Sequence, residues 1–349
     1  MAFESLKNLP ISFWHAQCVS LEDEILICGG FCINACYSYH LVVQDYKSVC
    51  TYPTNLESAL NGHGVIKCEK SASTKSKDKK KEEKVDIEEE MLLSFGGESS
   101  SSNNHVLLMK YKSVWENPNY QNVWHPLRNG FGSNHYMEYV RAVISGPNDS
   151  YLFIVYPLRN LAVIDLNSLQ CIAKEELPIE RLWFGSCFVK ANDELLLFTY
   201  RQGLSIKQID NFRRLKYQVF SVCDGLKDTN SYSFVCLRNS VVVFFGGYQK
   251  DGTHSNHIFQ FFVHDQSWKL CPLQMPVAIS GTCAVVERDA LWIHIIGGHD
   301  GNRPKKRHCK IKTKEFIGVY LFFFFFFLCS FFFFFFKKKK KKQKGQNEV

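Results

Sequence analysis

Cysteine and histidine residues near the N-terminus are the first candidates for chemistry. Cys28, Cys32 and Cys36 recur every four residues and His40 follows, and these are ligand types that Zn²⁺ prefers. Zinc sites typically combine a C-x2-4-C pair with a second pair farther along, and no second pair follows here. Cys28 also lies in an apolar run, EILIC, where a free cysteine behaves as a small hydrophobic residue. We therefore expect no metal site and no cofactor.

Histidines farther along the chain could act as general bases. His254 and the His299-Asp300 pair lie in predicted loops, whereas His294 lies within the apolar run LWIHII and is expected in the core. No spacing places a nucleophile, a base and an orienting group together. The sequence also contains no GxGxxG, P-loop or HExxH motif. We expect no catalytic residues and a chain that is not an enzyme.

The charge and cysteine content exclude several classes of protein. The net charge of +8 is concentrated at the C-terminus, where residues 337–349 hold seven Lys and one Glu; the rest has 35 basic and 33 acidic residues. A nearly neutral body lacks the basic patch of a nucleic-acid-binding protein. The N-terminus has no apolar segment typical of a signal peptide. We therefore expect a cytoplasmic protein whose 14 cysteines are reduced.

A repeat organises most of the chain. Four apolar runs end in a glycine pair, and two similar runs at 151–155 and 194–200 lack one; the last three steps are roughly 43 to 51 residues long. Leu-Pro or Met-Pro pairs at 9–10, 177–178 and 275–276 keep the same register. Six units of about this length are typical of propeller blades. The pairs are Gly29-Gly30, Gly96-Gly97, Gly246-Gly247 and Gly297-Gly298.

These residues resemble the kelch repeat over roughly residues 3–313. The fifth unit matches best, with Gly246-Gly247, Phe262, Asp265, Trp268 and Met275-Pro276. The second unit keeps its glycine pair and Trp124, and the third keeps only the IDLNSL turn and Leu177-Pro178. The resemblance implies an all-β fold, a six-bladed kelch-type β-propeller over residues 1–315 with degenerate blades 3 and 4. It also implies glycines at close backbone approaches and tryptophans wedged between blades.

Ring closure is predicted from the two ends of this region. The sixth unit has three candidate strands, GTCAVV, ALWIHII and roughly 307–313, and then its pattern stops. Residues 3–8 resemble a fourth strand, because Phe3, Leu6 and Leu9-Pro10 parallel the spacing of the fourth strand in the fifth unit. We predict that the N-terminal strand completes the last blade and removes exposed sheet edges.

Two segments fall outside the repeat. Residues 69–90 hold seven Lys and eight acidic residues, a composition expected of a disordered loop insertion. The tail, 316–349, begins with 21 uncharged residues, 316–336, long enough to cross a bilayer as a helix. Its two blocks of six Phe and its six Lys are also what T-rich and A-rich DNA would encode if translated. Two interpretations stay open, a membrane anchor and a gene-model artefact.

The kelch resemblance implies a scaffold or adaptor that binds an unidentified protein through loops on one face, and we expect a monomer that binds no nucleic acid. Alternatives are a kelch-type enzyme acting on a small carbohydrate and a membrane-tethered kelch protein. Exposed aromatic and charged residues are the expected contacts. In the segments after the glycine pairs and the Leu/Met-Pro pairs these are Trp14, Arg181, Trp183, Tyr248, Asp251, His299, Asp300 and Arg303.

Overall fold

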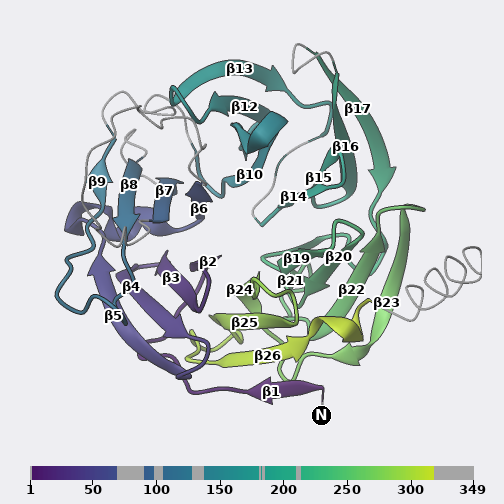
Figure 1. Cartoon of the computed structure of the whole chain (residues 1–349). Coiled ribbons are helices and arrows are strands. Elements are labelled where there is room, and N and C mark those ends of the chain that lie inside the picture. Colours follow the sequence, from purple (N-terminus) through teal and green to yellow (C-terminus); the bar gives the residue numbers. More distant parts are fainter. Residues whose placement is uncertain are drawn as a thin grey trace, which may run out of the picture.

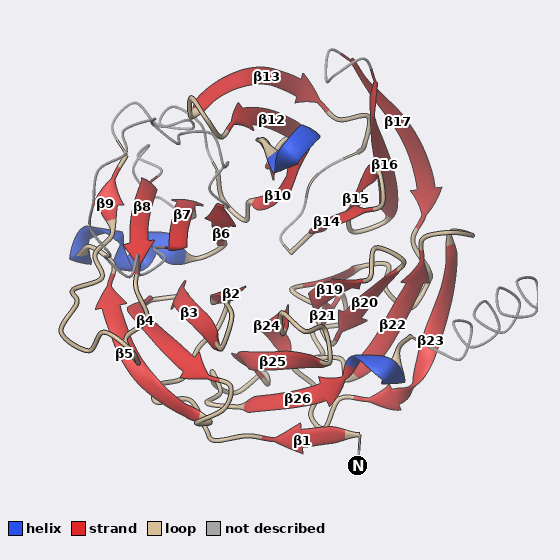
Figure 2. Cartoon of the chain, viewed as in Figure 1, coloured by secondary structure: helices blue, strands red, loops and turns tan. Residues whose placement is uncertain are grey.

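Six four-stranded antiparallel sheets surround a common axis (Figure 1). The computed structural model describes residues 2–68, 90–97, 105–127, 137–180, 182, 185–209 and 214–317. Each sheet corresponds to one predicted unit, so the all-β, six-bladed β-propeller is confirmed. Blades 3 and 4 are complete sheets although they lack glycine pairs. Helix in the described residues is limited to three 3-10 segments, η1 (Thr54–Leu60), η2 (Pro147–Asp149) and η3 (Thr313–Glu315) (Figure 2).

The blades follow one another along the chain, and each runs from an innermost to an outermost strand. Blade 1 comprises β2 (Gln17–Ser20), β3 (Glu24–Gly30), β4 (Ile33–His40) and β5 (Asp45–Thr51), and blade 2 comprises β6 (His63–Cys68), β7 (Glu90–Gly96), β8 (His105–Tyr111) and β9 (His125–Pro126). Blade 3 comprises β10 (Arg141–Ser145), β11 (Tyr151–Tyr156), β12 (Asn160–Asp165) and β13 (Gln170–Glu176), and blade 4 comprises β14 (Cys187–Ala191), β15 (Glu194–Phe198), β16 (Gln202–Ile209) and β17 (Arg214–Ser221). Blade 5 comprises β19 (Ser233–Leu237), β20 (Val241–Phe245), β22 (His257–Phe262) and β23 (Ser267–Gln274), and blade 6 comprises β24 (Ser280–Val286), β25 (Trp292–His299), β26 (His308–Lys312) and β1 (Phe3–Ser5). A two-stranded ribbon, β18 (Thr229–Asn230) with β21 (Tyr248–Gln249), accompanies blade 5.

Hydrophobic patterning follows the radial position of each strand. The second strands are covered on both faces, and every residue of β3 and of β20 is buried. The outermost strand β17 alternates between exposed and half-buried residues because only one of its faces meets a neighbouring blade. The continuous apolar runs of the sequence are therefore the second strands of the blades.

Aromatic side chains fill the wedges between blades, as the kelch resemblance implies. Trp268 on β23 of blade 5 lies 5.6 Å from the Phe198 ring of blade 4, and its Nε1 donates to the Ser221 carbonyl at 3.0 Å. Trp124 of blade 2 stacks on Tyr52, the residue after β5, at 4.9 Å. Both tryptophans thus join consecutive blades, and the predicted wedge is confirmed.

The N-terminal strand closes the ring. β1 pairs antiparallel with β26, with Phe3 opposite Ile311 and Ser5 opposite Cys309. The chain then continues along the same edge, where the Leu9 amide donates to the Lys306 carbonyl at 2.9 Å, and the Leu9 side chain is buried. The predicted closure is confirmed, and it joins residues separated by almost the whole domain.

The boundaries between the propeller and the two segments outside the repeat differ slightly from the predicted ones. Glu90, assigned to the insertion, is the first residue of β7 and pairs with Lys67 at 2.7 Å. Phe316, assigned to the tail, is buried against Phe245, and its carbonyl accepts a hydrogen bond from Gln260. The remainder of the insertion, 69–89, and of the tail, 318–349, lies outside the described residues. Within the described ranges, no helix has the length and apolar character needed to cross a membrane.

The glycine pairs form joints between consecutive blades. In blade 6 both Gly297 (φ +69°) and Gly298 (φ +99°) are left-handed, and the Gly298 amide donates to the Phe13 carbonyl, which leads into blade 1, at 2.8 Å. A Cβ on Gly297 would lie 2.5 Å from that carbonyl oxygen. The same arrangement joins Gly96-Gly97 to Met137 and Gly246-Gly247 to Ile279. A side chain would strain the backbone and block the joint.

Removing residues 1–9 tests ring closure. We expect a loss of at least about 2 kcal/mol in the free energy of unfolding, because β1 and the buried Leu9 side chain leave together. Thermal unfolding monitored by circular dichroism measures the change. Glu4→Gln, which alters only a long surface pair with Lys310 at 3.7 Å, serves as control and should stay within about 0.5 kcal/mol. An unchanged midpoint in the truncated protein would refute closure by β1.

Alanine substitution tests the blade joint. Gly297→Ala should destabilise the protein by about 3 kcal/mol, since a left-handed alanine and a blocked carbonyl contact add together. Gly252→Ala is the matched control: its φ is +85°, but a Cβ there has nothing nearer than the Tyr248 hydroxyl at 3.7 Å. It should cost only about 1 kcal/mol. Equal losses in urea unfolding would show that the carbonyl contact contributes nothing.

Candidate functional site

A collar of six left-handed residues surrounds the axis at the start of the innermost strands. Every blade contributes one residue with φ between 50° and 80°, at or just before its first strand. The Gly281 amide donates to the Ser231 carbonyl at 2.6 Å, and the His15 amide donates to the Gly281 carbonyl at 2.9 Å, so blades 5, 6 and 1 are linked directly. The collar residues are His15, Gly62, Tyr139, Gly185, Ser231 and Gly281.

Sequence reasoning missed the collar because its members share a backbone conformation and not a residue type. Three of them, His15, Tyr139 and Ser231, are not glycine, although left-handed backbone disfavours side chains. The rings of His15 in blade 1 and Tyr139 in blade 3 lie 6.0 Å apart, which shows how closely the collar approaches the axis. The collar therefore narrows one end of the propeller.

Arg141 lies next to the collar, two residues after Tyr139 on β10. Its Nε donates to the Ser186 carbonyl and its Nη1 to the Val140 carbonyl, both at 2.8 Å. The positive charge of Arg141 contributes to lowering the pKa of His15 in blade 1 and of His63 in blade 2. Cys187, Tyr232 and Cys283 of blades 4, 5 and 6 in turn act on Arg141. One arginine thus interacts with groups from all six blades, which places it near the axis.

Arg141 brings a positive charge to this central region. Burial lowers the pKa of Arg141, but a guanidinium keeps its proton in proteins. Burial, then the charge of Arg141, lowers the pKa of His15 to about 3, so His15 is neutral at pH 7. Among the residues that the structure describes, no carboxylate forms an ion pair with Arg141.

An aromatic patch lies on the same face of the propeller. We define it as Trp14, Phe31, Tyr248, His254 and His299. Trp14 contacts the rings of Phe31 and His299, each at 4.9 Å. His299 stacks on His254 at 5.9 Å, and His254 meets Tyr248 at 5.3 Å. Phe31 and Tyr248 are each 40% exposed, so the patch presents apolar rings to solvent.

Three of the predicted contact residues, Trp14, Tyr248 and His299, thus come together in the patch, and Asp300 follows directly. Asp300 forms an ion pair with Lys305 and accepts the backbone N–H groups of Asn302 and Arg303. The Lys305 pairing, with these amides, lowers the pKa of the Asp300 carboxyl. Asp300 therefore shapes the loop beside the patch.

The other predicted contact residues lie farther from the patch centre or outside the described residues. Asp251 and Arg303 are exposed at loop tips, and Asp251 accepts hydrogen bonds from the amide and hydroxyl of Thr253. Arg181 and Trp183 lie outside the described residues. Sequence reasoning did not select Phe31 as a contact; the available signal was an aromatic residue directly after a glycine pair.

The cysteine series near the N-terminus follows one β-hairpin. Cys28 and Cys36 are register partners on β3 and β4, and both are buried, as expected for core residues. Cys32 is exposed at the turn between these strands, and His40 lies at the far end of β4 against Trp115. The four-residue spacing therefore distributes the four side chains along the hairpin. In the described part of the chain, no group of three metal-ligating side chains gathers.

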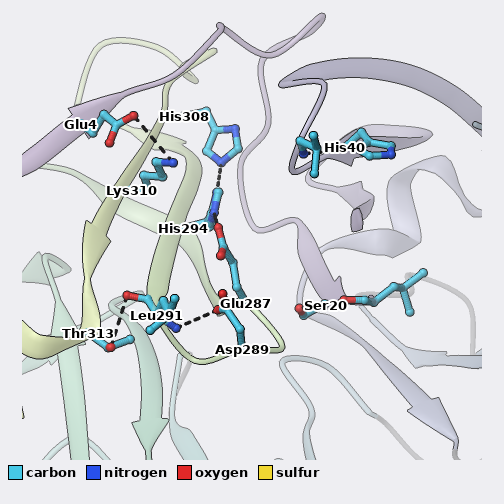
Figure 3. Close-up of polar contacts among 12 residues, drawn as sticks. Glu4, Ser20, His40, Glu287, Asp289, Leu291, His294, His308, Lys310 and Thr313 are labelled. Atoms are coloured by element: carbon cyan, nitrogen blue, oxygen red, sulfur yellow. Dashed lines mark hydrogen bonds and ion pairs between the residues drawn. The ribbon is translucent and has the colours of Figure 1, made fainter. Parts of the chain in front are cut away.

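His294 is buried, as predicted, in a polar chain between blades 6 and 1 (Figure 3). Its Nε2 lies 2.6 Å from a Glu287 carboxylate oxygen, and its Nδ1 lies 2.7 Å from Nε2 of His308. Nδ1 of His308 lies 2.5 Å from the Tyr46 hydroxyl. The Tyr46 hydroxyl also donates to the Lys7 carbonyl at 3.1 Å, so the polar chain continues to the N-terminal segment. The chain links the first and last blades.

Comparisons with known proteins agree on the fold alone. No protein-family model matches the chain, and no curated protein matches its sequence. The solved structure of YjhT is similar, with a TM-score of 0.62 at 12% sequence identity, and the match covers 87% of this chain and 96% of that one. At this level of sequence identity the similarity shows that the two proteins share a fold, and it says nothing about activity.

Acidification tests the buried histidine chain. Burial, then His294 and Lys310, holds the pKa of His308 well below its ordinary value of 6.5. The unfolded chain therefore binds the proton first, so this stability is present above pH 6.5 and is lost as pH falls. Each pH unit costs about 1.4 kcal/mol while folded His308 stays neutral.

Chemical denaturation at pH 7, 6 and 5 measures the effect. His308→Asn should reduce the loss of stability by about 1.4 kcal/mol per pH unit, because it removes one titrating group and leaves the buried His15 and His63 in place. His264→Asn, at an exposed histidine, is the control and should retain the slope of the unmodified protein. Identical slopes in all three proteins would contradict the assignment of a neutral, buried His308.

Proposed function

We propose that this chain is a kelch-type propeller acting as a non-catalytic interaction module, with the aromatic patch as its contact for a protein partner. The observation that carries the proposal is the run of touching rings from Phe31 through Trp14, His299 and His254 to Tyr248, with both end rings 40% exposed. Aromatic side chains dominate binding hot spots because they bury large areas at small cost in conformational entropy.

The surroundings of the patch suit a protein contact. Asp251, Asp300 and Arg303 lie in the loops that carry Tyr248 and His299, so charged groups border an aromatic centre. Stable interfaces commonly combine an apolar centre with a polar, hydrated rim. The loops rest on blade joints, which limits the ordering cost of binding.

The kelch assignment is supported by the glycine pairs. All eight paired glycines have positive φ, and each pair ends or directly follows the second strand of its blade. Three of the four pairs approach a carbonyl of the following blade. Propellers that share this repeat commonly bind partners through loops on one face, which is where the patch lies.

Site-specific photo-crosslinking tests the proposal. A photoreactive phenylalanine analogue at Tyr248 should give covalent adducts with a defined partner, identified by mass spectrometry. The same analogue at Leu270, 54% exposed on the outer strand β23, is the control and should give none of that partner. The double variant Phe31→Ala, Tyr248→Ala should reduce recovery of the partner at least tenfold. Equal adducts at both positions would contradict a role for the patch.

A further inference from the structure

Some of the N–H groups of the Arg141 guanidinium have no hydrogen-bond acceptor among the described residues. A guanidinium carries five N–H groups, and in this side chain one on Nε and one on Nη1 have acceptors, the Ser186 and Val140 carbonyls. No other acceptor contacts it within the described part of the chain, so both N–H groups on Nη2 are available. The side chain is nevertheless largely enclosed by protein and only partly accessible to solvent. Cationic side chains are rarely enclosed without an anionic partner.

Four of the groups around Arg141 are neutral at pH 7. Burial lowers the pKa of His15 to about 3 and that of His63 to about 4. Burial also raises the pKa of the Cys187 thiol well above its usual range and raises the pKa of the Tyr232 hydroxyl. Arg141 therefore brings a positive charge to this part of the propeller, on a planar group with several N–H donors.

We propose that Arg141 forms a binding site for one carboxylate at the collar end of the propeller axis. The planar guanidinium presents parallel N–H groups that match the two oxygens of a carboxylate. One positive charge balances one carboxylate, whereas a phosphate dianion or a nucleic acid would require more cations than the described residues place here. Arg141 keeps partial contact with solvent, and a carboxylate would reach it from there.

A second donor lies against the collar. The indole Nε1 of Trp14 is buried and has no hydrogen-bond partner among the described residues, and it faces Gly281 of the collar beside His15. An indole N–H can only donate, so it also suits an oxygen acceptor. The Arg141 site does not depend on the patch binding a protein.

The carboxylate has two sources, a free organic acid and an acidic side chain of a protein, and different probes separate them. We would titrate the full chain with acetate and with N-acetylglutamate N-methylamide, whose only carboxylate is that of the side chain. Chloride and phosphate at equal ionic strength are the controls for general anion effects. Binding is read by isothermal titration and by the shift of the thermal midpoint.

Saturable binding of either carboxylate at one site per chain is the expected result. Binding of acetate points to a free acid, and binding of the glutamate amide alone points to a protein side chain. Arg141→Gln should weaken binding at least tenfold. Arg141→Lys keeps the positive charge but loses the planar pair of N–H donors, so it should weaken binding less. Arg288→Gln, at an exposed arginine 3.3 Å from Glu22, should bind normally.

A measurement without ligand provides an independent readout. Arg141→Met should raise the thermal midpoint of the free protein, because it removes an enclosed charge that lacks an anionic partner. A structural arginine would behave oppositely, since its two carbonyl contacts would be lost. The proposal is overturned if no carboxylate binds, if chloride or phosphate binds equally, if Arg141→Gln binds like the unmodified protein, or if Arg141→Met lowers the midpoint.

Discussion

A hydrogen bond from a paired glycine to a carbonyl at the entrance of the next blade forms three of the joints between consecutive blades, including the joint at ring closure. At such a joint the backbone of the second strand meets the segment that enters the following blade, without any intervening side chain. The joint between Gly298 and Phe13 connects blade 6 to blade 1, where the two ends of the domain meet. At each of these three joints the glycine pair holds the segment that leads into the innermost strand of the next blade.

The joints also decide where the functional features lie. Residues directly after a glycine pair, such as Phe31, Tyr248 and His299, leave the second strand on the collar face and are held beside segments of the next blade. Blades 3 and 4 lack the pair and turn back tightly through Leu158 and Arg201. The loops after the second strands of blades 5 and 6 are longer than those of blades 3 and 4, and with Phe31 of blade 1 they form the aromatic patch. Arg141 enters from blade 3 and supplies the charge at the centre.

Much of this arrangement could be predicted from the sequence because it depends on residue type. Paired glycines, apolar second strands and the N-terminal match to a fourth strand all leave visible patterns. The collar could not be predicted from the sequence. Tyr139 and Ser231 adopt a left-handed backbone conformation, and neither residue type indicates that conformation. Arg141 was overlooked for a related reason: in the run YVRAVIS it reads as the solvent-facing residue of a strand. Only closure of the ring turns that face towards the axis.

Residue-resolved hydrogen exchange of the paired-glycine amides tests the central claim most directly. If the joints hold the blades together, the amides of Gly97, Gly247 and Gly298 exchange only through global unfolding, at rates matching those of the buried second strands. Exchange of these three amides at the rates of exposed loops would contradict that claim, because it would show that side-chain wedges alone hold the blades together.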